Sequence, residues 1–283
     1  MIPSYRMPKD LRIRRRYLGK GLKSLKDSEV LDIHKGISLL QSENPTVSIV
    51  IIAFNEELNI LSTLDSLSAL RPKVPIEIIV VDNNSTDLTA ETIRRSGAKY
   101  VFEARQGYAA ARQAGLLHAK GKFVISGDAD TLYPPHWVEA MTEPFKDTNV
   151  VCTSGLYAFY TDKGDHPWSL RFYQIAKHIS LILKVIQRPH LVCMGGTMAY
   201  RREKAMEVGG YDLNVVRGSD GTLAWELGRL GKIKIVISRR GMVWTSMRRT
   251  LKEGSLWKAF VYRFQKDMKP FFEYFFPQKK RTY

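Results

Sequence analysis

From Pro45 onward the chain alternates short apolar strand patterns with helical patterns, and polar or acidic residues follow the strands. We expect strands at 47–54, 76–81, 99–102 and 122–126. Helices are expected to open at 55–57, to follow a cap at Ser85 or Thr86, and to run over 107–119. Because strands separated by helices form parallel sheets covered on both faces, the order predicts an α/β fold: a Rossmann-like, mostly parallel sheet flanked by helices.

Three acidic clusters follow the predicted strands: Glu56 and Glu57, Asp82 and Asp87, and Asp128 and Asp130. In open α/β sheets, ligands bind at the edge formed by the carboxyl ends of the strands. Each acid taken alone also fits a helix cap or a first-turn charge, and for Asp87 we prefer that interpretation. The gathering of all three clusters on one edge favours a ligand site there.

The net charge of +16 is concentrated at the two ends of the chain. Residues 1–26 carry nine Lys or Arg against one acid, and residues 248–283 carry ten against three, so the body is close to neutral. Nucleic-acid-binding proteins usually carry their basic patch on the folded face, so we expect no nucleic-acid partner. Basic flanks rich in aromatic residues favour an anionic membrane surface, although two solvated basic tails explain the charge equally well.

The apolar segments and the cysteines of the 283-residue sequence indicate the cellular compartment. The densest apolar run, 47–54, is far shorter than the roughly 20 residues that cross a bilayer, and no apolar signal-peptide stretch begins the chain. Cys152 and Cys193 have apolar neighbours and no metal-ligand spacing, which predicts buried thiols in a reducing compartment. We therefore expect a cytoplasmic protein, in contact with the cytoplasmic face of a membrane at most at its surface.

The segment Asp128-Ala-Asp130 follows the fourth predicted strand directly. Two carboxylates at i and i+2 on a strand exit can hold one hard divalent cation, or divide between a metal and a sugar hydroxyl. Such a cation bridges the oxygens of a diphosphate and neutralises the charge that grows on it as a leaving group.

In this context the chain resembles glycosyltransferase family 2, the nucleotide-sugar-dependent inverting enzymes with the GT-A fold. The resemblance covers Pro45 to Arg249 and rests on five segments in the family's order and spacing. These are VSIVIIAFNEE at 47–57, IVVDNNSTD at 79–87, GYAAARQAG at 107–115, GDAD at 127–130, and GGYD at 209–212 followed by Ser219-Asp220. It implies a GT-A domain at 45–249. The charge and aromatic pattern of the flanks indicates a basic N-terminal arm at 1–44 and a basic, aromatic helical extension at 250–283.

The resemblance also implies roles for residues at the strand exits. Ala53, Phe54 and Glu56 would contact the base and ribose, and Asp82 the nucleobase. Arg105 and Gly107 precede a helix whose N-terminus would face the nucleotide. Asp128 would reach the ribose or the metal, and Asp130 would be the principal ligand of Mn²⁺ or Mg²⁺.

Asp220 stands where the family has its general base, which takes the proton from the acceptor hydroxyl. Ser219 replaces the usual Glu of a Glu-Asp pair, and capping of the following helix is the alternative role for Asp220. The late His that many relatives use as a metal ligand is missing. The chain instead has a segment that resembles the Ser-x-Arg-Arg ending of some family members, formed by Ser246, Arg248 and Arg249. The two arginines could contact the diphosphate through their forked donors. The alternative is a surface charge pair unconnected with the substrate.

The expected function is thus metal-dependent, inverting transfer from a UDP- or GDP-sugar to a glycan or lipid-linked glycan, in polysaccharide, glycolipid or cell-envelope synthesis. Three alternatives remain: a nucleotidyltransferase, a non-catalytic nucleotide-sugar binder and a polyanion-binding protein.

Residues 168–187 look helical, with a basic stripe on a wide apolar face, and burial against the sheet explains that pattern better than a membrane interface does.

Overall fold

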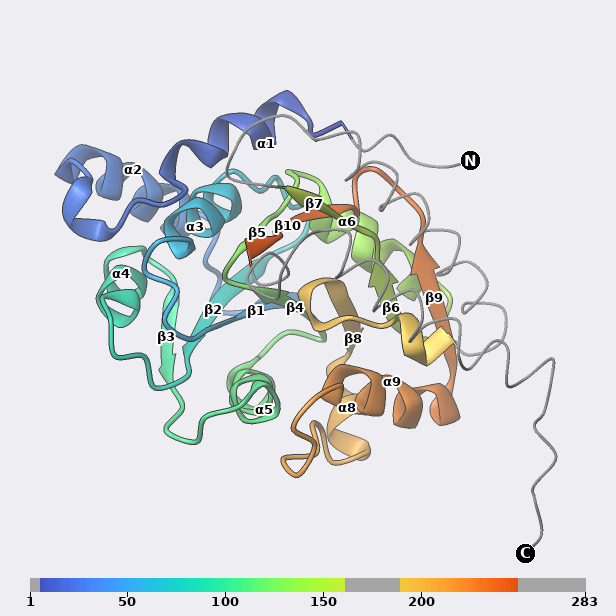
Figure 1. Cartoon of the computed structure of the whole chain (residues 1–283). Coiled ribbons are helices and arrows are strands. Elements are labelled where there is room, and N and C mark those ends of the chain that lie inside the picture. The colour runs from blue at the N-terminus through green and yellow to red at the C-terminus, as the bar shows by residue number, and fades with distance from the viewer. Residues whose placement is uncertain (1–5, 161–188, 249–283) are drawn as a thin grey trace, which may run out of the picture.

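A seven-stranded sheet in the order β3-β2-β1-β4-β8-β6-β9 forms the centre of the computed structural model, which describes residues 6–160 and 189–248 (Figure 1). Its strands are β1 (Val47–Ala53), β2 (Ile76–Asp82), β3 (Lys99–Phe102), β4 (Phe123–Asp128), β6 (Val150–Gly155), β8 (Met198–Arg201) and β9 (Lys232–Val236). Strand β8 runs antiparallel to β4 and β6, whereas the other neighbouring pairs are parallel. The prediction of a mostly parallel sheet is confirmed.

Helices cover both faces of this sheet (Figure 1). One face carries α3 (Ile60–Ser68), α4 (Thr89–Arg95) and α6 (Trp137–Thr142), and the other carries α5 (Tyr108–His118), α8 (Arg202–Glu207) and α9 (Ser219–Leu230). Because side chains alternate along a strand, Ile49 and Ile51 of β1 enter the core under α3, while Val50 and Ile52 enter the core under α5. Burial on both faces explains why this strand is an unbroken apolar run.

A second, three-stranded sheet lies beside the first in the order β5 (Thr131–Leu132), β10 (Val243–Ser246), β7 (Tyr157–Tyr160). Strand β10 pairs with β5, which follows β4 almost directly. This pairing returns the chain to the carboxyl edge of the large sheet, where Arg248 is placed. Short 3-10 turns also occur in this part of the chain: η3 (Glu143–Lys146), η4 (Pro189–Val192) and η5 (Gly195–Thr197).

The N-terminal residues 6–44 pack against the α/β core. They form α1 (Lys9–Arg14), η1 (Arg15–Tyr17), η2 (Leu22–Ser24) and α2 (Asp27–Ser38). Leu11 packs with Trp244 of the small sheet, and Tyr17 lies 1% exposed in the main core. Two arginines, Arg14 and Arg16, reach the buried carboxylate of Asp65 on α3 at 2.8 and 3.3 Å. Part of the basic N-terminal charge is therefore used in holding the fold together.

Two helices begin later than the sequence predicts. Residues 55–57 are not helical and α3 begins at Ile60; α4 begins at Thr89, so capping by Ser85 or Thr86 is wrong. The reason is a set of bonds between the loops after β1 and β2. The Asn55 amide donates to Ser85 Oγ at 3.0 Å, and the Thr86 amide donates to Asn55 Oδ1 at 2.9 Å. These contacts hold both strand exits open as loops at the ligand edge.

Asp87 has a structural role in the loop just before α4, whose N-cap residue is Leu88. Its carboxylate accepts the Thr89 amide at 2.9 Å, at the start of α4, and the Glu57 amide at 3.2 Å. Cys152 and Cys193 are both buried thiols that form no disulfide, as predicted. The helix expected over 168–187 and the extension at 250–283 lie outside the described residues.

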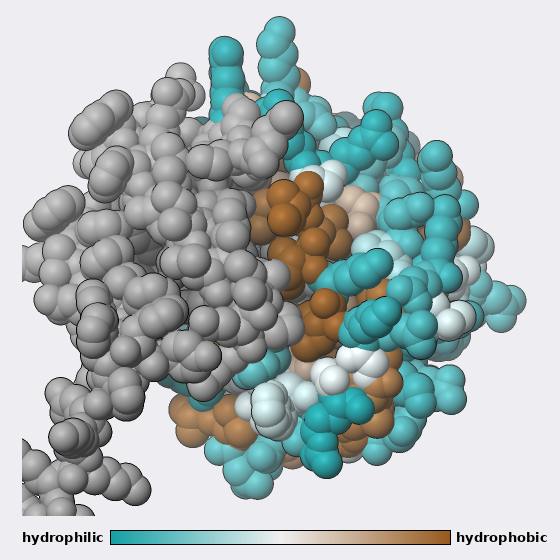
Figure 2. All heavy atoms as spheres, turned by 90° about the vertical axis from the view of Figure 1, so that its right-hand side faces the viewer, coloured by the Kyte–Doolittle hydropathy of each residue, from teal (hydrophilic) through white to brown (hydrophobic). Residues whose placement is uncertain are grey.

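Figure 2 shows the right-hand side of Figure 1, where the edge strand β9 lies. Apolar side chains gather in one area of this face, with hydrophilic side chains around part of it. Such areas are common on protein surfaces and by themselves identify no partner. In residues 6–160 and 189–248, no helix combines the length and apolar character that a membrane span needs.

Candidate active site

A cleft of about 550 Å³ opens at the carboxyl edge of the large sheet, between the ends of β1, β2 and β4. Its wall is built from strand ends, the loop before α5 and one arginine after β10: Ile52, Ala53, Phe54, Asn55, Glu56, Asn83, Gln106, Gly107, Tyr108, Ala111, Asp128, Ala129 and Arg248. The volume suits a ligand of the size of a nucleotide. The cleft lies at the edge that the three acidic clusters predicted.

Most residues predicted to bind a nucleotide sugar line this cleft. They are Ala53, Phe54, Glu56, Gly107 and Asp128, together with Arg248. Gly107 has a φ of +138°, which residues with a side chain rarely adopt, and no other heavy atom outside its chain neighbours lies near the place of a Cβ. Its amide donates to Asn83 Oδ1 at 2.8 Å, so the loop before α5 is fixed to the exit of β2.

Asp82 and Arg105 lie outside the residues that line the cleft. Asp82 is 2% exposed, and its two carboxylate oxygens accept the Ser85 amide at 3.1 Å and the Tyr100 hydroxyl at 3.2 Å. Arg105 donates to the carbonyl of Leu213 at 3.1 Å. Asn83, one residue after Asp82, lines the cleft instead. Arg249 lies outside the described residues.

Arg112 of α5 pairs with two acids of the site, Asp128 and Asp220. Its side chain is 3% exposed, and its Nη2 donates to Asp128 Oδ1 at 2.9 Å. Its Nε forms an ion pair with Asp220 Oδ1 at 2.8 Å, and its Nη1 donates to Ser126 Oγ. One buried cation thus brings together the first acid of the Asp128-Ala-Asp130 segment and the predicted general base.

Two glycines make room for this cluster. A Cβ on Gly195 would lie 2.1 Å from Arg112 Nη2 and 2.4 Å from Asp220 Oδ1. A Cβ on Gly196 would lie 2.7 Å from Asp128 Oδ2. The backbone of η5 therefore passes directly over the charged side chains, and this close approach explains the Gly-Gly pair.

Asp220 is the second residue of α9, in the first turn, where a helix favours negative charge. Its side chain is 22% exposed. Burial raises the pKa of Asp220 above its ordinary value of 3.8, and the charge of Asp128 adds to this, while Arg112 and the Gly195 amide act against it. The charges of Asp220 and Asp128 in turn raise the pKa of Arg112 despite its burial, so the guanidinium stays charged. A partly open carboxylate with a raised pKa is the usual state of a general base.

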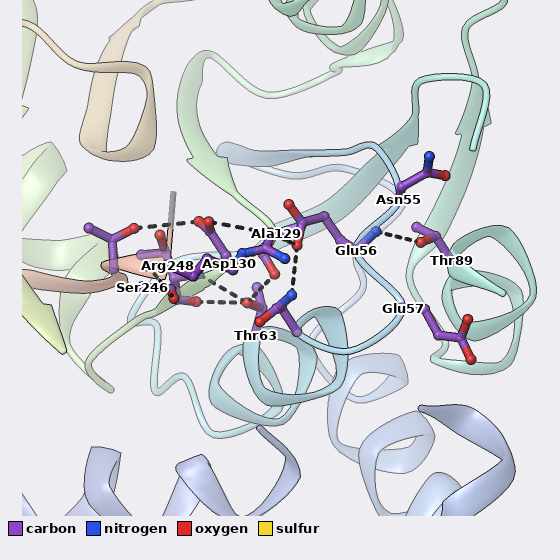
Figure 3. A network of polar contacts seen from close by, with 12 residues as sticks. Asn55, Glu56, Glu57, Thr63, Thr89, Ala129, Asp130, Ser246 and Arg248 are labelled. Carbon is purple, nitrogen blue, oxygen red and sulfur yellow. Dashed lines mark hydrogen bonds and ion pairs between the residues drawn. The ribbon is translucent and has the colours of Figure 1, made fainter. Parts of the chain in front are cut away.

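Asp130 points to a different neighbour, Arg248 (Figure 3). The Asp130 side chain is 7% exposed; Thr245 Oγ1 donates to Oδ1 at 3.4 Å, and Arg248 Nη2 lies 3.8 Å from Oδ2. The same Nη2 donates to Glu56 Oε2. The carboxylate of Glu56, 3% exposed, also accepts Asn59 Nδ2 at 3.0 Å. Glu56 and Asp130 therefore share a guanidinium at the border of the cleft.

The donor set fits a divalent ion that arrives with a diphosphate. Within 6–160 and 189–248, no three His, Cys, Asp or Glu side chains converge on a point that could hold a metal ion. Mg²⁺ and similar ions, however, are commonly bound by one or two carboxylates together with substrate phosphates. Asp128 and Asp130 supply that number, and the missing Cβ of Gly196 leaves room beside Asp128 Oδ2.

Arg112, which pairs with both Asp128 and Asp220, is not among the site residues expected from the sequence. The signal that could have found it is its place in GYAAARQAG, where a lone arginine occurs among small apolar residues of a helix packed on a sheet. Such a charge is buried only if it is paired. The ring of His190 packs edge-on against Trp225, with 4.8 Å between the ring centroids.

Comparison with known proteins identifies the family. Residues 48–209, more than half of the chain, match the model of glycosyl transferase family 2. An uncharacterized glycosyltransferase of Nostoc sp. is 27% identical over 201 residues, which are 66% of this chain and 61% of that protein. A glycosyltransferase of Haloferax volcanii is 30% identical over 44% of this chain and 43% of its own length. The chain thus spans less than two thirds of these relatives.

Solved structures share the fold. A glucosyl-3-phosphoglycerate synthase from Mycobacterium tuberculosis, in complex with Mn²⁺, UDP-glucose and phosphoglyceric acid, aligns with a TM-score of 0.50 and 24% identity over 73% of this chain and 72% of that one. A mannosyltransferase from Pyrobaculum calidifontis, in complex with GDP-mannose and Mn²⁺, aligns with a TM-score of 0.54 and 22% identity over 77% and 67%. The predicted GT-A type of α/β fold is confirmed, and the chain belongs to glycosyl transferase family 2.

Proposed function

We propose that this glycosyltransferase moves a sugar from a nucleoside diphosphate sugar of the UDP or GDP type to an acceptor hydroxyl, with inversion at the anomeric carbon. The observation that carries the proposal is the ion pairing of Arg112 with both Asp128 and Asp220. Asp128 lines the cleft, so the shared cation keeps Asp220 beside the end of the cleft at which the diphosphate would lie. A donor site and a base that are held together in this way fit a direct displacement.

The nucleotide would occupy the cleft, with its base and ribose against Ala53, Phe54 and Asn83. Asp82, behind Asn83, supports the loop that shapes this part of the wall. The N-terminus of α5, an eleven-residue helix, opens at Gly107 in the cleft wall and offers backbone amides to an anion. Arg105, whose guanidinium reaches Leu213, would hold the loop before α5 rather than the nucleotide.

Asp128 and Asp130 would hold a divalent ion, Mn²⁺ or Mg²⁺, against the diphosphate. When bound, such an ion neutralises the negative charge that develops on the leaving group. Both solved relatives are complexes with Mn²⁺ and a nucleotide sugar, which supports the same requirement here. Arg248, and Arg249 beside it in the sequence, would add forked donors to the diphosphate oxygens.

Asp220 would act as the general base. The acceptor hydroxyl gives its proton to the carboxylate while its oxygen forms the new bond to the anomeric carbon, and the bond to the diphosphate breaks. One base and no covalent nucleophile suffice for a single displacement, and this gives inversion. Ser219, which stands beside Asp220, is 2% exposed and therefore cannot reach a substrate in the way that a second acid would.

We propose a glycan or lipid-linked glycan as the acceptor, in polysaccharide, glycolipid or cell-envelope synthesis, at the cytoplasmic face of a membrane. The basic, aromatic residues 250–283 would bind anionic lipid. Sedimentation with anionic vesicles at low salt tests this, and loss of binding on deletion of 256–283 is the expected result. Equal binding by the truncated chain would contradict it.

The proposed donor is tested by a thermal-shift screen of UDP- and GDP-sugars, each with and without Mn²⁺. A ligand that binds the native state raises the free energy of unfolding by mass action, by about 2.7 kcal/mol at a hundredfold excess over Kd. The melting temperature rises with it. We expect one donor class to do so, with a larger shift when Mn²⁺ is present. Shifts with nucleoside triphosphates alone would favour a nucleotidyltransferase, and retention on a polyanion column with no nucleotide effect would favour a polyanion-binding protein.

A further inference from the structure

Arg248 occupies the position at which a cation is needed in this site. Glu56 and Asp130 come from the exits of β1 and β4, and both side chains are almost fully buried, at 3% and 7% exposure. Buried carboxylates need a partner of opposite charge. The Nη2 of Arg248 donates to Glu56 Oε2 and lies 3.8 Å from Asp130 Oδ2 (Figure 3).

The backbone fixes Arg248 in this place. The Ser246 amide at the end of β10 donates to the Asp130 carbonyl at 3.0 Å, and the Arg248 amide donates to Ser246 Oγ at 3.3 Å. The pairing of β10 with β5 thus brings the arginine to the edge of the large sheet at which both acids lie. Its side chain is 26% exposed and lines the cleft, so a ligand in the cleft can reach it while the two acids lie behind it.

We propose that Arg248 is a resident cation that keeps a divalent ion off Asp130 until a nucleoside diphosphate enters the cleft. This inference rests on the proposed function and adds an order of events to it. A divalent ion that approaches Asp130 in the ligand-free protein is repelled by the like charge of the guanidinium. The same guanidinium already neutralises part of the negative charge of the two carboxylates, so they attract the ion less.

A diphosphate changes this balance. Its oxygens accept the forked donors of Arg248 better than a single carboxylate oxygen does, because a guanidinium binds phosphate through two parallel bonds. Once the guanidinium turns toward the cleft, the charge of Asp130 becomes available to an ion that the diphosphate also binds. Ion and donor therefore bind together, and Asp130 exchanges the guanidinium for the ion.

The test measures Mn²⁺ binding directly, from the electron paramagnetic resonance signal of free Mn²⁺. Wild type, R248Q and R248K are titrated without nucleotide and with UDP or GDP, and nucleotide without protein is titrated as the blank. We expect the Kd of wild type for Mn²⁺ to fall at least tenfold when the nucleotide is present. R248Q without nucleotide should bind Mn²⁺ at least tenfold more tightly than wild type, whereas R248K, which keeps the charge, should resemble wild type.

The matched control is R240Q, which removes an exposed arginine from the turn between β9 and β10, outside the residues that line the cleft, and should leave both titrations unchanged. If R248Q does not melt cooperatively, R248M, which keeps the apolar stem, takes its place. As a second readout, Mn²⁺ alone should raise the melting temperature of R248Q and leave that of wild type unchanged.

Equal Mn²⁺ affinity of wild type and R248Q without nucleotide would overturn the inference, and so would the absence of Mn²⁺ binding in every titration. Turnover of a nucleotide sugar, measured on the same wild-type preparation, is independent of both results. A transferase that turns over its donor while Arg248 has no effect on Mn²⁺ would lose this inference and keep the proposed function.

Discussion

The Nε of Arg112 lies 2.8 Å from Oδ1 of Asp220, and the two groups come from helices, α5 and α9, that are far apart in the sequence. The arginine is 3% exposed and the aspartate 22%. This pair connects the donor side of the cleft to the predicted base. The pKa of Asp220 therefore depends on the charge of Arg112 as well as on burial.

Arg112 should control the pH at which the enzyme works. Burial raises the pKa of Asp220 and Arg112 lowers it, so R112Q should raise that pKa further. Because only the ionised carboxylate can accept a proton, the acid limb of the kcat profile should move to higher pH in R112Q. R112K, which keeps a charge, should move it less. An unchanged acid limb in R112Q would contradict this role, even if the overall rate fell.

Gly195 should not tolerate a side chain. A Cβ there would lie 2.1 Å from Arg112 Nη2, so G195A should lower the free energy of unfolding by about 1–3 kcal/mol through overpacking. The control is G221A in α9, where the nearest atom to a new Cβ is the His190 carbonyl oxygen at 3.7 Å. That change should be neutral or stabilise by up to about 1 kcal/mol, because alanine favours helix. Urea unfolding of both variants measures the difference, and equal stability would contradict the packing described.

The tie between the N-terminal residues and α3 should respond differently to changes on its two sides. Asp65 has a side chain that is 3% exposed, whereas Arg14 and Arg16 are 29% and 48% exposed. Loss of both arginines leaves a buried charge without these partners, so R14Q/R16Q should cost about 3 kcal/mol. D65N leaves two arginines that water can solvate, and should cost about 1 kcal/mol. Denaturant unfolding tests the order, and a larger loss in D65N would contradict it.

The sequence predicted the strands and the ligand edge well because these depend on local pattern. The apolar run at 47–54 and the acids after it are short-range features, and β1, β2 and β4 form close to the predicted residues. Parallel pairing then brings their ends together without further information.

The charge pairs of the site could not be predicted in the same way. Arg248 and Glu56 are 192 residues apart, and nothing local indicates that β10 returns the chain to the exit of β4. The same holds for Arg112, whose two acids come from β4 and α9. The helix starts at Ile60 and Thr89 were missed because the preceding loops bond to each other rather than to their own helices.

Replacement of Asp220 by Asn, assayed with the donor that the nucleotide-sugar screen identifies, tests the account most directly. Asparagine keeps the shape of the side chain and cannot take the acceptor proton. We expect donor Kd within about threefold of wild type and a fall in the transfer rate of about 10²–10⁴-fold, the usual size of a general-base contribution. Transfer by D220N at a rate close to that of wild type would show that the base lies elsewhere and would contradict the proposed mechanism.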